Sequence, residues 1–156
     1  MEFVTDRTQA DVDLVNRLRA KGWNNMTASE QRLWDQGLKG AYNYTDLNRV
    51  ESNVAHLSVM LGLTLITKTN WTEWDRPTAT EMNRYIGNVW AIREECLRRG
   101  GNFRFNPTPD TMNNFNWFYA NCIEMDLESA YQVLTEHSSG VLGKAELGKL
   151  VLGKEL

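Results

Sequence analysis

The sequence is poor in the residues and motifs on which catalytic and metal sites are usually built. It has two cysteines and two histidines in 156 residues, with no HExxH pattern and no CxxC pair. A zinc site is therefore not expected. GxSxG, P-loop and GxGxxG motifs are also absent from the sequence. We therefore expect no enzyme activity and no catalytic, metal-binding or cofactor-binding residues.

The charge pattern and the apolar runs argue against two further classes of protein. The formal net charge is −3, without a block of like charges, which argues against binding to nucleic acid through phosphate neutralisation. No apolar run is long enough to span a bilayer, and the N-terminus lacks the basic start and apolar stretch of an export signal. We expect a protein made in the cytosol that binds neither nucleic acid nor membrane.

Both cysteines fall within apolar patterns of helical spacing. Cys96 and Cys122 are therefore expected to be buried, reduced thiols. A disulfide between their two helices is the alternative, and it would require an oxidising compartment.

Apolar residues recur at spacings of three and four, which predicts an all-α protein. Short loops between the helical patterns indicate a compact bundle of about five helices over residues 1–137. Residues 63–67 alternate weakly and are expected to form a short strand or an extended crossing. The last helix is expected over about residues 113–136. The other four helices are expected to begin after the cap residues Thr8, Thr27, Thr45 and Thr78.

The C-terminal segment, residues 138–156, contains "LGKAELGKLVLGKEL", in which Leu-Gly-Lys recurs every five residues. A period of five matches neither a helix face nor a strand face, and repeated glycine opposes a long helix. We expect an extended arm, with a disordered tail as the alternative. The apolar content favours docking on a partner or on copies of the same chain. The expected partner-binding residues are Val141, Leu142, Leu147, Leu150, Val151 and Leu152.

A second candidate site lies in "NWTEWDRPTATE", residues 70–81. Trp71 and Trp74 stand beside Glu73 and Asp75, and aromatic rings next to carboxylates are suited to binding a sugar surface. The alternative is that both tryptophans cover the bundle while the acids stay solvated. A third interpretation takes Glu73 and Asp75 as the paired carboxylates of a glycosidase.

Four stretches resemble a small module encoded in phage and prophage structural genes of Gram-positive bacteria, where it is found among tail, baseplate and tail-fibre proteins. The resemblance covers roughly residues 5–135, and its strongest part is "LKGAYNYTDLNRVE" at residues 38–51. The other stretches are "DRTQADVDLVNRLRAKGW", "TNWTEWDRPTATEMNRYIGNV" and "YANCIEMDL". The repetitive tail also resembles short Leu-Gly segments of such tail proteins. The family contributes no catalytic residue.

The resemblance implies a structural or adaptor protein of a phage tail, baseplate or tail fibre, attached through the arm at residues 138–156. Its partners would be other tail proteins or copies of itself. Because tails are symmetric, it would form a homo-oligomer such as a trimer or hexamer. It would reside in the virion tail after synthesis in the bacterial cytoplasm. The alternative is a receptor-binding protein that recognises host-surface carbohydrate.

Overall fold

The computed structural model describes residues 1–100 and 103–152, and its described side chains end at residue 136. Within this part of the chain there are five α-helices and no strand, which confirms the predicted all-α bundle. Residues 63–67, where a short strand was one alternative, have no regular structure. The α-helices are α1 (Gln9–Lys21), α2 (Ala28–Asp35), α3 (Tyr44–Leu61), α4 (Ala79–Arg99) and α5 (Trp117–Leu152), and 3-10 turns occur at Trp23–Asn25 and Met112–Asn114.

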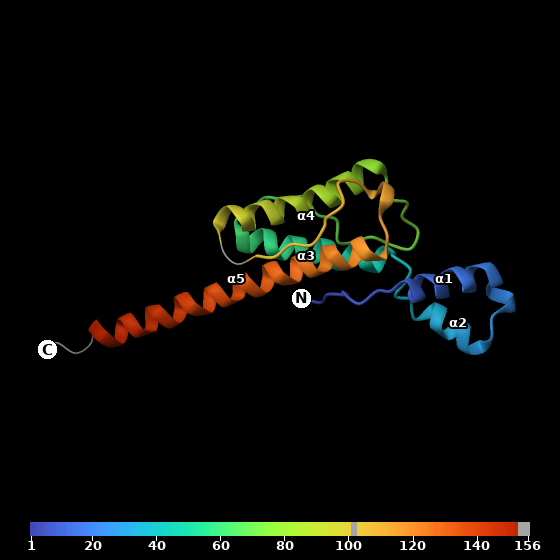
Figure 1. The fold of residues 1–156 in the computed structure, drawn as a ribbon, viewed down its shortest axis with the longest axis horizontal. Helices are drawn as coiled ribbons and strands as arrows, with labels where there is room; N and C mark the ends of the chain where they lie inside the picture. The colour runs from blue at the N-terminus through green and yellow to red at the C-terminus, as the bar shows by residue number, and fades with distance from the viewer. Residues whose placement is uncertain (101–102, 153–156) are drawn as a thin grey trace.

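Helices α3, α4 and α5 pack against one another and form the body of the molecule (Figure 1). Helices α1 and α2 form a hairpin at one end of this body, and α5 leaves it at the other end (Figure 1). None of the helices in the described ranges combines the length and the apolar character that a membrane crossing requires.

Local capping explains where the helices begin. Thr8, Thr27 and Thr78 cap their helices, as the sequence predicts. Each side chain accepts a hydrogen bond from the backbone N–H three residues ahead, and the acid at that position accepts from the backbone N–H of the threonine. The third helix was predicted to begin after Thr45, which is wrong. Asn43 caps α3 instead, because its side chain accepts from the Thr45 backbone while Asp46 accepts from the Asn43 backbone.

The core lies where α3, α4 and α5 meet. Each helix contributes apolar residues three or four positions apart, so that one stripe on each faces the other two. Both cysteines are free thiols in this core, which confirms that prediction. The fully buried apolar residues include Val50, Leu57, Leu61, Tyr85, Ile86, Ile92, Ile123 and Leu127.

The C-terminal segment, residues 138–156, was predicted to be an attachment arm, and this stays a prediction. Helix α5 runs without a break to Leu152 (Figure 1). Continuing an existing helix adds one hydrogen bond per residue and avoids the cost of nucleation, which offsets the low helix propensity of the repeated glycines. Residues 153–156 lie outside the described residues.

Candidate functional site

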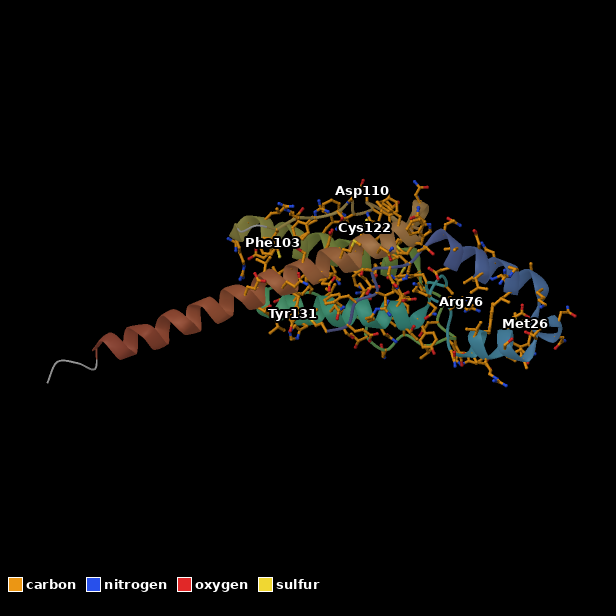
Figure 2. All side chains as sticks on the ribbon, turned by 60° about the horizontal axis from the view of Figure 1, so that its bottom comes forward. Met26, Arg76, Phe103, Asp110, Cys122 and Tyr131 are labelled. Atoms are coloured by element: carbon orange, nitrogen blue, oxygen red, sulfur yellow. The ribbon has the colours of Figure 1, made fainter. Side chains whose placement is uncertain are left out.

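A cleft of about 680 Å³ lies where the hairpin meets the body. Its walls are the end of α2 (residues 34–37), the segment leading into α3 (residues 42–45 with Leu47) and the loop at residues 71–77. Figure 2 shows Arg76 of this loop at the junction between the body and the hairpin that carries Met26. Two nearby stretches of the chain, residues 34–37 and 42–47, therefore meet the more distant loop at one site.

Trp71 is part of the body and not an exposed platform. Its side chain is 3% exposed and belongs to the core cluster. The Glu51 carboxylate accepts from its indole Nε1 at 3.4 Å, and the Lys68 ammonium lies 3.6 Å from the ring centroid. One face of the indole is thus covered by a cation. Trp71 therefore covers the bundle, which was the alternative interpretation of its sequence position.

Trp74 has the opposite environment. Its side chain is 81% exposed, and its neighbours Glu73 and Asp75 line the cleft. The structure therefore separates the two tryptophans that the sequence suggested as one sugar-binding surface. Three aromatic residues that the sequence did not single out also line the cleft. Tyr42 packs against Phe115 and is hydrogen-bonded to Tyr85, whereas Trp34 is half-buried and Tyr44 is 40% exposed.

Glu73 and Asp75 also differ from each other. Asp75 accepts from the Thr72 backbone N–H at 2.6 Å and from the Thr72 hydroxyl, and it lies 3.5 Å from the Lys68 ammonium. These hydrogen bonds, with a smaller contribution from Lys68, lower the pKa of Asp75. Glu73 is exposed and makes no hydrogen bond or ion pair with the described residues. A glycosidase acid needs a raised pKa, so Asp75 is unsuited to that role.

Two buried ionic networks hold the walls of the cleft. Next to Trp71, Arg84 donates to both oxygens of Glu51 at 2.6 and 2.5 Å and to the carbonyl of Ile66 at 2.8 Å. The Glu51 carboxylate also accepts from the Lys68 backbone N–H at 3.0 Å. This network fixes the loop that follows α3, and with it the position of Trp71.

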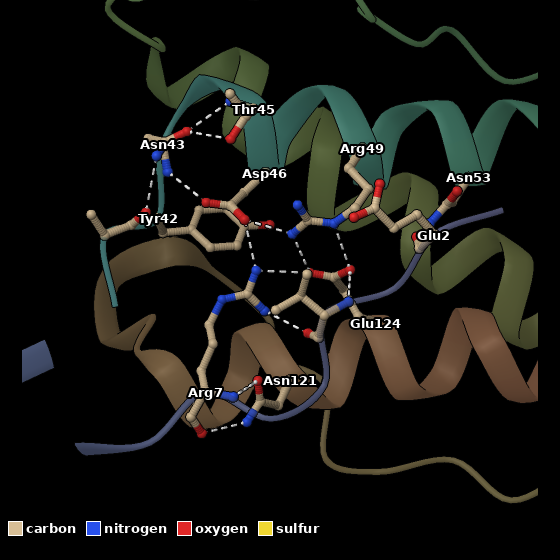
Figure 3. Close-up of polar contacts among 12 residues, drawn as sticks. Glu2, Arg7, Tyr42, Asn43, Thr45, Asp46, Arg49, Asn53, Asn121 and Glu124 are labelled. Carbon is tan, nitrogen blue, oxygen red and sulfur yellow. Dashed lines mark hydrogen bonds and ion pairs between the residues drawn. The ribbon is translucent and has the colours of Figure 1, made fainter. Parts of the chain in front are cut away.

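The second network joins the N-terminal segment, α3 and α5 (Figure 3). Arg7 donates to Asp46 at 2.7 Å and to Glu124 at 2.9 Å, and Arg49 donates to the same two carboxylates. Asn121 pairs with the Arg7 backbone in both directions. The two carboxylates balance the two guanidinium groups, so the cluster is neutral.

The remaining predicted features give no further site. Among the described residues, no group of three or more His, Cys, Asp or Glu side chains is placed to hold a metal ion. The side chains predicted to bind a partner lie outside the described ones. They belong to Val141, Leu142, Leu147, Leu150, Val151 and Leu152, all on the last turns of α5.

Comparison with known proteins adds no relative to this description. No family model matches the chain, and no curated protein and no solved structure matches it significantly. The function is therefore inferred from the structure itself. The features used are the helical body, the projecting α5 and the cleft at the hairpin.

Proposed function

We propose that this chain is a structural or adaptor component of a phage tail, baseplate or tail fibre, or of a phage-derived particle. Residues 138–156 attach it to a neighbouring tail protein or to further copies of itself. The resemblance of residues 5–135 to phage tail modules supports the setting. The observation that carries the proposal is the projection of α5 beyond the body (Figure 1).

Helix α5 projects because it is longer than the helices it packs against. Helix α5 has 36 residues and its neighbour α4 has 21, a difference of about 22 Å at 1.5 Å per residue. A helical segment of this size is marginal in water unless it packs against something. Its leucine and valine content supports packing against another protein. In a symmetric tail, the result would be a trimer, a hexamer or a comparable ring.

The test is light scattering coupled to size exclusion, on the full chain and on a truncation that ends at Ser139. We expect the full chain to be oligomeric and the truncation to be monomeric. Where both are monomers, pull-down with the other tail proteins decides. A full chain that stays monomeric and binds no tail component would refute the proposal.

A matched pair of variants distinguishes association through the projecting segment from nonspecific association through other exposed apolar side chains. Leu147→Ser with Leu150→Ser changes the projecting segment, and we expect it to reproduce the truncation. Val59→Ser makes the same kind of change at an apolar side chain that is 80% exposed on α3. We expect Val59→Ser to leave the oligomeric state unchanged.

Binding to host-surface carbohydrate is the second function that we propose. It is favoured by Trp74, a large apolar side chain that is 81% exposed and adjacent to two residues of the cleft. The test is co-sedimentation of the protein with purified Gram-positive cell walls. We expect wild type to sediment with the walls and Trp74→Ala to sediment less.

A further inference from the structure

We infer that the cleft between the hairpin and the body binds a neutral or amine-bearing sugar, and that the rings of Trp34 and Tyr44 are its stacking faces. This ligand class rests on the second proposed function and names a site for it. It differs from the surface that the sequence suggested, because Trp71 is enclosed in the core. It also excludes a class of ligand, the phosphate-bearing polymers.

The size and the walls of the cleft suit a small polyol. Its volume of about 680 Å³ lies within the range of typical ligand pockets. Trp34 comes from α2 and Tyr44 from the start of α3, so the two rings stand on different walls. Neither side chain makes a hydrogen bond to a described residue. The Trp34 indole N–H and the Tyr44 hydroxyl are therefore unpaired within the described chain and can bond to a ligand.

Two carboxylates of the cleft are unused acceptors. Asp35 and Glu73 line it as exposed carboxylates, and neither forms an ion pair with the described residues. Sugar hydroxyl groups donate to such oxygens. A protonated amine would add an ionic attraction to the carboxylates and a cation–π contact with the rings.

The charge of the lining disfavours anions. The lining carries three carboxylates, those of Asp35, Glu73 and Asp75, and a single guanidinium, that of Arg76. The Lys68 ammonium lies 3.5 Å from Asp75, so one negative charge remains in excess. The positive end of α3 also opens toward the cleft, because Asn43 to Thr45 line it. That end is already satisfied, since the Asn43 side chain and the Asp46 carboxylate accept its first N–H groups. A phosphate would therefore meet net negative charge.

The experiment is a fluorescence titration at neutral pH in about 0.15 M salt, where charges are screened beyond about 8 Å. Three probes are compared: a glucosamine tetramer, the same tetramer N-acetylated, and a glycerol phosphate polymer. We expect both sugars to bind and the polymer to bind about tenfold more weakly or less. Tyr44→Ala should raise the Kd for both sugars by up to about tenfold, because one stacked ring is lost. Asp35→Asn with Glu73→Gln should weaken the glucosamine tetramer alone.

The control is Trp23→Ala, an aromatic residue that is 45% exposed and lies outside the cleft lining. It should bind like wild type. Equal losses in Trp23→Ala and Tyr44→Ala, or tightest binding of the glycerol phosphate polymer, would overturn the inference. If that polymer binds and cell walls still co-sediment, only the ligand class is wrong. If neither sugars nor walls bind, the second proposed function fails as well.

Discussion

Glu124 shows how a single residue ties separate elements together. It is fully buried on α5, where it accepts from the Val4 backbone at 2.7 Å, from Arg7, and from both Nε and Nη2 of Arg49. A buried carboxylate is tolerated only where paired donors compensate for its lost hydration. Within the described chain, the Nε of Arg7 is the buried side-chain nitrogen or oxygen that has no hydrogen-bond partner. The cluster therefore has little capacity to lose another contact.

We predict that Glu124→Ala lowers the free energy of unfolding by about 3–5 kcal/mol, because two buried guanidinium groups then share one carboxylate. Urea denaturation measures the loss. Asp6→Ala removes one of the two carboxylate partners of Lys39, with the Asp6 side chain 76% exposed, and should change stability little. A similar small change in Glu124→Ala would show that the cluster is not stabilising.

At the scale of the helices, local signals predicted most of the fold. The cap residues Thr8, Thr27 and Thr78 were predictable because a capping box involves only four consecutive residues. The start of α3 was predicted at the wrong residue because Asn43 and Thr45 are both good cap residues. The Asp46 carboxylate accepts from the Asn43 backbone N–H and so completes the cap at Asn43.

Two glycines provide a matched test of packing between the helices. A Cβ at Gly40 would lie 2.3 Å from the backbone of Asp11, whereas a Cβ at Gly87 in α4 would meet nothing within 4 Å. We predict that Gly40→Ala destabilises the protein by displacing α1, and that Gly87→Ala stabilises it by about 1 kcal/mol through helix propensity. Thermal unfolding of both variants checks this. Equal effects at the two positions would contradict the close approach.

The hairpin is predicted to be sensitive to acid through Glu30. A hydrogen bond from Lys21 at 2.6 Å, followed by the Thr27 backbone, lowers the pKa of Glu30 to about 2. Because the folded pKa lies below the unfolded value of 4.5, this stabilisation is present above pH 4.5 and is lost as the pH falls through about 2. The difference in Tm between wild type and Glu30→Gln should therefore shrink from pH 7 to pH 2. A constant difference would exclude Glu30 as the cause.

At the scale of the whole molecule, the two core thiols report on global opening. Cys96 is fully buried and Cys122 is 3% exposed, and burial raises the pKa of Cys96 to about 11 and also raises that of Cys122. We predict that both resist a thiol reagent in the native state and react together on unfolding. Leu97→Cys places a thiol at a position that is 57% exposed. As a control, this thiol should react rapidly with the reagent in the native state. Rapid labelling of wild type would contradict the closed core.

The cleft could not be predicted from the sequence, since its walls come from segments that meet only in the folded chain. Trp71 and Trp74 are three residues apart, but the sequence does not show that Glu51 and Lys68 enclose the first and leave the second exposed. Trp34 and Tyr44 line the same cleft because the hairpin lies beside the body, which no local pattern in the sequence shows.

Asp46 fastens both ends of the hairpin at once. One of its oxygens accepts from Arg7, just before α1, and the other accepts from the Asn43 backbone, just after the segment that follows α2. A single carboxylate thereby closes residues 7–43 into a noncovalent ring, much as a crosslink would. Such a ring limits how far residues 7–43 can separate from one another. The entropic cost of closing it grows only slowly with the number of residues enclosed. Loss of that one carboxylate would therefore release the N-terminal segment before α1 and the start of α3 together.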